Sequence, residues 1–118
     1  MRILLVDDEE ELVETICERL RLRGIEAEWA TSSEDALKKT SAQQFDVAVL
    51  DIKMPRVGGL ELKKSLQMLW PDMKFVFLTG YGSERDFKVI MEEFGQDNYL
   101  FKPVDIDELI AKITLVCS

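Results

Sequence analysis

The sequence predicts an α/β fold: a five-stranded parallel sheet, in the order 2-1-3-4-5, with helices on both faces. Three observations lead to this prediction. Short apolar runs of strand length alternate five times with segments of helical period. Three of the runs are almost continuously apolar, as in strands covered on both faces, and two are partly polar, as in edge strands. The 118 residues suffice for one domain, residues 1–118.

The strands are placed by their composition. Residues 2–6, 47–50 and 74–78 are rich in Val, Ile, Leu and Phe, and we expect them at the centre of the sheet. Residues 26–30 alternate polar and apolar side chains, and residues 98–102 are polar at both ends, so these segments are expected at the edges. Joined by right-handed crossovers, the five strand-helix units form a flavodoxin-like (βα)5 arrangement.

The first two helices are predicted from apolar spacing and end signals. In the first, one face carries Leu12, Val13, Ile16 and Leu20, and Gly24 provides a left-handed cap. Residues 31–34, from Thr31 to Glu34, form a capping-box pattern that opens a short second helix.

The remaining three helices follow the same rules. The third has Leu62, Leu66 and Leu69 on one face and closes at Trp70-Pro71. In the fourth, Ser83 and Asp86 mark the beginning, and the side chains expected to face inward are Phe87, Ile90, Met91 and Phe94. Asp105 caps the fifth, whose apolar stripe is Ile106, Leu109, Ile110, Ile113 and Cys117.

Composition excludes several functional classes. The chain has no histidine, which rules out a Ser-His or Cys-His catalytic pair, most zinc sites and a histidine phosphodonor within it. A net charge of −8 argues against direct nucleic-acid contact. Cys17 and Cys117 lack a metal or redox spacing, which favours a reducing, cytoplasmic setting. We expect no membrane span and no signal peptide.

Polar residues collect where the predicted strands end. Asp7 and Asp8 follow the first strand, Asp51 the third, Thr79 the fourth, and Lys102 ends the fifth. Each has a plain structural alternative as a helix cap, a turn residue or a solvated charge. Together at one sheet edge, however, three carboxylates repel one another unless a cation joins them, and all-oxygen ligands favour Mg²⁺. With Lys102 and Thr79 alongside, the pattern predicts a phosphoryl-transfer site.

The chain resembles the receiver domain of two-component response regulators over its whole length. The resemblance rests on ILLVDDE (3–9), VLDIKMP (49–55), GGLEL (58–62), LTGY (78–81) and NYLFKP (98–103). It implies that Asp51 is the phosphoacceptor, that Asp8 binds Mg²⁺ directly and Asp7 through water, and that the Lys53 carbonyl is a further ligand. It also implies that Thr79 and Lys102 hold the phosphoryl oxygens and that Tyr99 is the switching aromatic.

The resemblance also implies a function and partners. A sensor histidine kinase would donate the phosphoryl group, and the change would reach an output domain or downstream protein through the surface of the fourth helix, fifth strand and fifth helix. Phosphorylation-linked homodimerisation through this surface stays open. Such a domain catalyses its own phosphorylation and dephosphorylation but is not a turnover enzyme.

Three other functions are alternatives to a phosphoacceptor domain. An aspartate-nucleophile phosphatase would carry an Asp-x-Asp-x-Thr run after the first strand, which this chain lacks. A flavin- or nucleotide-binding module would need a phosphate-cradling glycine loop, and neither common form occurs. An inactive receiver that acts without phosphorylation is the third alternative, and it stays open.

Overall fold

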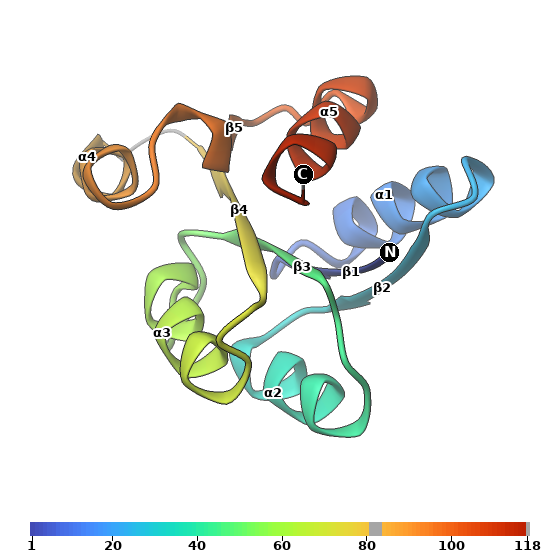
Figure 1. Ribbon diagram of the computed structural model, residues 1–118, viewed down its shortest axis with the longest axis horizontal. Helices are drawn as coiled ribbons and strands as arrows, with labels where there is room; N and C mark the ends of the chain where they lie inside the picture. The colour runs from blue at the N-terminus through green and yellow to red at the C-terminus, as the bar shows by residue number, and fades with distance from the viewer. Residues whose placement is uncertain (81–83, 118) are drawn as a thin grey trace.

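One parallel sheet organises the chain. The computed structural model describes residues 1–80 and 84–117 (Figure 1). The five strands lie in the order β2-β1-β3-β4-β5, which confirms the predicted order. Their bounds are Arg2–Val6 for β1, Glu26–Ala30 for β2, Val47–Asp51 for β3, Lys74–Thr79 for β4 and Tyr99–Phe101 for β5.

Helices cover both faces of this sheet, as predicted (Figure 1). They are α1 (Glu10–Leu22), α2 (Ser33–Ala42), α3 (Gly59–Leu69), α4 (Glu84–Glu93) and α5 (Ile106–Cys117), with a 3-10 turn, η1 (Gln96–Asn98), before β5. Helices α1 and α5 pack on one face, and α2, α3 and α4 on the other. Among residues 1–80 and 84–117, every helix is too short or too polar to cross a membrane.

The strands supply two cores, because successive side chains of a strand point to opposite faces. In β1, Ile3 and Leu5 pack with α1 and α5, whereas Leu4 and Val6 pack with α2 and α3. All four side chains are fully buried. The continuous apolar run therefore reflects burial on both sides, and it fixes the end of β1 rigidly at the edge where Asp7 follows.

Local signals explain most helix ends. Gly24 has a φ of 77°, and its N–H and that of Ile25 bond back to carbonyls of α1, as in a left-handed cap. Asp105 Oδ1 accepts hydrogen bonds from the N–H groups of Asp107 and Glu108, which confirms it as the cap of α5. The prediction for α2 was wrong by one residue: Ser32, not Thr31, accepts the capping bond from the N–H of Asp35.

Other boundary and facing predictions need correction. The strand predicted at residues 98–102 is shorter in the structure, because Asn98 lies in η1 and Lys102 follows β5. The side chain of Asn98 donates a hydrogen bond to the carbonyl of Phe75. Three side chains expected to face the core are exposed, namely Leu69, Met91 and Cys117. Leu69 and Cys117 are the last residues of their helices, where the sheet no longer covers them, whereas Met91 directly follows the buried Ile90 and lies on a more exposed side of α4. The cap predicted at Ser83 lies outside the described residues.

Candidate functional site

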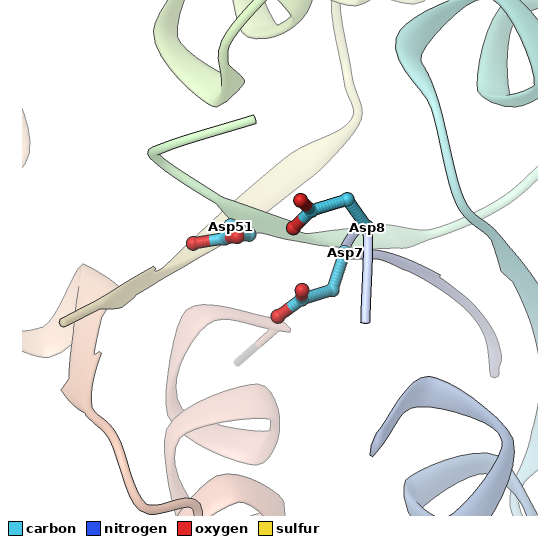
Figure 2. A group of neighbouring side chains, drawn as sticks. All are labelled: Asp7, Asp8 and Asp51. Atoms are coloured by element: carbon cyan, nitrogen blue, oxygen red, sulfur yellow. The ribbon is translucent and has the colours of Figure 1, made fainter. Parts of the chain in front are cut away.

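Three aspartates meet at the carboxyl edge of the sheet. Asp7 and Asp8 directly follow β1, and Asp51 is the last residue of the neighbouring strand β3. Figure 2 shows their side chains projecting in the same direction from the two strand ends. One carboxylate oxygen of each lies within 4.8 Å of the others. The parallel pairing of β1 and β3 thus joins residues that are more than 40 positions apart in the chain.

The three carboxylates differ in exposure. Asp7 is fully buried and Asp51 is 4% exposed, whereas Asp8 faces solvent. Asp7 Oδ1 accepts a hydrogen bond of 3.0 Å from the backbone N–H of Glu9. The cluster therefore has a buried inner side and an open outer side, as an ion site that exchanges ligands with solvent requires.

Lys102 is the cation of the cluster. It follows β5, and its Nζ lies 2.8 Å from Asp7 Oδ2, 3.2 Å from Glu9 Oε1 and 3.5 Å from Asp51 Oδ2. Burial lowers the pKa of this ammonium, but its contacts with Asp7, Asp51 and Glu9 outweigh burial and raise the pKa above its ordinary value. Lys102 is therefore a fixed positive charge beside Asp51.

Burial and charge also act on the carboxyl group of Asp51. Burial, followed by the charge of Asp7, raises the pKa of Asp51 from 3.8 to about 7. Lys102 and a hydrogen bond from the backbone N–H of Lys53 act in the opposite direction and offset part of this rise. Without a further cation, the folded protein thus disfavours the ionised, nucleophilic form of Asp51.

Two buried oxygens at this edge differ in how they are satisfied. Thr79 Oγ1, at the end of β4, is buried and has no hydrogen-bond partner among the described residues. Asp7 Oδ2 accepts no hydrogen bond, but it forms an ion pair with Lys102 Nζ at 2.8 Å. Buried polar atoms are normally satisfied, so Thr79 Oγ1 marks a place for a further partner. The three clustered carboxylates suit Mg²⁺, and the hydroxyl donor at the neighbouring strand end suits a phosphoryl oxygen.

Two further residues, Lys53 and Tyr99, carry predicted roles. The side chain of Lys53 is exposed two residues after Asp51, and its carbonyl as a metal ligand stays a prediction. Tyr99 begins β5 and is half-buried, with ring centroids of Phe87 at 4.8 Å and Phe101 at 5.2 Å. Tyr99 therefore belongs to an aromatic cluster that joins β5 to α4, and its role as the switching aromatic stays a prediction.

Sequence reasoning missed one member of the cluster. Glu9 contributes both its backbone N–H, to Asp7, and its carboxylate, to Lys102. The motif at residues 3–9 contains Glu9 but assigns it no role. Its position directly after two acids at a strand end was the available signal, but which of the neighbouring acids turns toward Lys102 depends on the path of the chain into α1.

Comparisons with known proteins find similar sequences over almost the whole chain. The family model described as "Response regulator receiver domain" matches residues 3–114. The chain is 35% identical over 113 residues to "Response regulator MprA" of Mycobacterium leprae (strain TN), covering 96% of this chain and 49% of that protein. It is 34% identical over 115 residues to "Alkaline phosphatase synthesis transcriptional regulatory protein PhoP" of Bacillus subtilis (strain 168), covering 98% and 48%. The chain thus spans about half the length of these curated relatives.

Solved structures give the same result. A response regulator receiver domain protein from Clostridium thermocellum superimposes with a TM-score of 0.87 at 30% identity, covering 98% of this chain and 93% of that one. A receiver domain protein (CheY-like) from Methanospirillum hungatei JF-1 superimposes with a TM-score of 0.85 at 35% identity, covering 97% and 90%.

Proposed function

This chain belongs to the response regulator receiver domain family, and from that premise we propose that it is a phosphoacceptor switch. Asp51 receives a phosphoryl group from a histidine of a separate sensor kinase. The phosphorylated domain then controls an output domain or a downstream protein. The free thiols of Cys17 and Cys117 fit the cytoplasm, where this exchange would occur.

The proposal assigns Mg²⁺ to the aspartate cluster. Asp8 and Asp51 are the direct protein ligands, Asp7 acts through water, and the Lys53 carbonyl completes the set. The proximity of the three carboxylates and their all-oxygen donor set support this assignment. When bound, Mg²⁺ neutralises carboxylate charge and orients phosphoryl oxygens.

The protein's own groups carry the transfer. A carboxylate oxygen of Asp51 forms the new O–P bond while the N–P bond to the kinase histidine breaks, and the imidazole leaves with the electron pair. Lys102 holds one phosphoryl oxygen by charge, and Thr79 donates its buried hydroxyl to another. Water later cleaves the acyl phosphate and restores Asp51, so the chain changes its own state and does not turn over a separate substrate.

The magnitude of these contacts suits a switch. Moving a two-state element from 1:99 to 99:1 needs roughly 5.5 kcal/mol. Charge-assisted hydrogen bonds are worth about 1.5 to 3 kcal/mol each, so two new ones, from Thr79 and Lys102, supply roughly 3 to 6 kcal/mol. Thr79 ends β4 and Lys102 directly follows β5, and these strands lead into α4 and α5, which favours the surface of α4, β5 and α5 as the region that changes.

Tyr99 is the proposed relay to that surface. It packs between Phe87 of α4 and the exposed Phe101 of β5, so a shift of either element alters the aromatic cluster. An output domain, a downstream protein or a second phosphorylated copy is the proposed partner here. The acidic domain itself is not expected to contact nucleic acid directly.

The observation that carries the proposal is the contact of Lys102 with Asp7 and Asp51 inside the aspartate cluster. Incubation with acetyl phosphate and Mg²⁺, followed by intact-mass measurement, tests it. We expect a gain of one phosphoryl group that EDTA prevents. Asp51→Asn should show no gain, while the matched control Asp72→Asn, in an exposed turn, should behave as the original chain. No gain in the original chain would favour an inactive, phosphorylation-independent receiver.

A further inference from the structure

A second lysine, Lys63, is buried outside the aspartate cluster. Lys63 of α3 is 3% exposed, although lysine side chains are almost never buried without a partner. Its Nζ lies 2.6 Å from Oε1 of Glu93, in the last turn of α4, and 4.9 Å from the ring centroid of Phe94. Gln67 Oε1 accepts a further bond of 3.4 Å. This single ammonium therefore ties α3 to the end of α4.

The beginning of α3 contacts the backbone at the end of β3, where Asp51 lies. The N–H of Gly59 donates to the carbonyl of Ile52 at 3.0 Å. A Cβ added at Gly59 would lie 2.3 Å from the carbonyl oxygen of Asp51, so only glycine permits this approach. Lys63 follows Gly59 by four residues, one turn along the same side of the helix. A shift in the backbone of Asp51 and Ile52 would therefore move Gly59, and Gly59 lies one helical turn before Lys63.

Helix α4 is held at its two ends by different groups. Phe87, in its first half, packs against Tyr99 and Phe101 of β5. At its other end, Ile90 is fully buried, Phe94 packs on Phe77 with ring centroids 5.3 Å apart, and Lys63 pairs with Glu93 (α3 and α4, Figure 1). The Tyr99 contact thus reaches one end of α4, and the Lys63 contact reaches the other.

We propose that Lys63 is a positioning residue that couples the backbone of the phosphoacceptor, through α3, to the last turn of α4. The inference rests on the proposed function, because it describes how phosphorylation of Asp51 reaches α4. It adds a second connection to the one through Thr79 and Tyr99. Lys63 suits this role because its ammonium is buried whereas the Glu93 side chain is 46% exposed, so loss of the Glu93 contact would leave an uncompensated buried charge on Lys63.

Amide hydrogen exchange, read by mass spectrometry with and without acetyl phosphate and Mg²⁺, tests the coupling. The variants are Lys63→Met, which keeps the side-chain length, Glu93→Gln and the double variant. Lys64→Met is the matched control, because Lys64 is the exposed neighbour on the same helix. Intact mass is recorded for every sample, and all variants are expected to gain one phosphoryl group.

Two results are expected of Lys63→Met. Before phosphorylation, amide hydrogen exchange of residues 90–94 becomes about 5- to 30-fold faster, as expected when a side-chain interaction of ordinary strength is lost. After phosphorylation, the change in exchange at residues 90–94 falls to about half or less of its original size, while the change at Tyr99–Phe101 is retained. Glu93→Gln should act in the same direction, and the double variant should add little to Lys63→Met.

Results that contradict the coupling role can be distinguished from results that contradict the proposed function. If phosphorylated Lys63→Met shows the same response in α4 as the original chain and Lys64→Met, the coupling role is wrong. Fully additive effects of the two single substitutions would also overturn it, since the residues would then act separately. If Lys63→Met does not fold, Glu93→Gln alone decides by the same criterion. Absence of any mass gain in the original chain would instead refute the proposed function.

Discussion

Asp51→Asn should stabilise the metal-free protein at neutral and alkaline pH, although Asp51 is the proposed acceptor. The folded state raises the pKa of Asp51 from 3.8 to about 7, through burial and the charge of Asp7. Between these two values the unfolded chain has lost the proton and the folded chain has kept it. The free energy of unfolding therefore falls as pH rises through this interval and is lowest above pH 7.

The structure sets the size of the effect. One pH unit of difference corresponds to about 1.36 kcal/mol, so the rise from 3.8 to about 7 amounts to roughly 4 kcal/mol. Asparagine cannot ionise and removes this penalty, but Lys102 loses its 3.5 Å contact with the carboxylate. Lys102 keeps Asp7 and Glu9, so we expect a net gain of about 2 to 4 kcal/mol at pH 8. At pH 5 the penalty itself is only about 1.6 kcal/mol, and the gain should be correspondingly smaller.

Urea denaturation in EDTA, followed by the fluorescence of Trp29 and Trp70, measures this gain at pH 5 and pH 8. Asp72→Asn is the control for a charge lost at an exposed site, and it should change the free energy of unfolding by less than about 0.5 kcal/mol. Adding Mg²⁺ should stabilise the original chain more than Asp51→Asn. The reasoning is refuted if Asp51→Asn is no more stable than the original chain at pH 8, or if its gain is the same at both pH values.

Three further predictions concern neighbouring groups. Lys102→Met leaves buried carboxylates without their cation, so in urea titration without metal it should lower the free energy of unfolding by about 3 to 5 kcal/mol. Mg²⁺ should restore part of this loss, and an equal loss with and without Mg²⁺ would contradict the prediction. Tyr99→Ala should leave the mass gain at Asp51 intact but weaken binding to the downstream partner, whereas unchanged affinity of the phosphorylated variant would refute the relay role. Gly59→Ala places a Cβ 2.3 Å from the Asp51 carbonyl oxygen and should lower the free energy of unfolding by more than about 3 kcal/mol, whereas Gly24→Ala, where only the φ of 77° is strained, should lower it by about 1 kcal/mol. Equal losses in urea titration would show that the backbone at Gly59 moves to accommodate the Cβ.

Predictions from sequence succeeded where a local pattern determines the structure. The apolar runs of the central strands and the half-polar edge strand β2 required only a count of apolar positions. Gly24 and Asp105 were recognised as caps because their roles depend on their own side chains, or lack of one. The pattern of Thr31 failed because two adjacent hydroxyl residues satisfy it equally, and the entry path of the chain selected Ser32.

Facing predictions failed at helix ends. Leu69 and Cys117 continue an apolar stripe by spacing, yet both are exposed. Helical periodicity states only which residues share a face. Whether that face is covered at its last position depends on how far the sheet and the neighbouring helices extend, and this information is not local.

The sequence by itself determined which groups stand at or directly after the carboxyl ends of the strands, because each apolar run is followed in the chain by its polar residue: Asp7, Asp8, Asp51, Thr79 and Lys102. Only the tertiary structure decided how far each charge is removed from water and which partner it meets. That difference distinguishes the buried Asp7 from the exposed Asp8. Desolvation and Coulomb energies depend on all the elements around a group, and these come from distant parts of the chain. The burial of Lys63 against Glu93, 30 residues further on, is of the same kind, since no local pattern on α3 specifies where α4 will end.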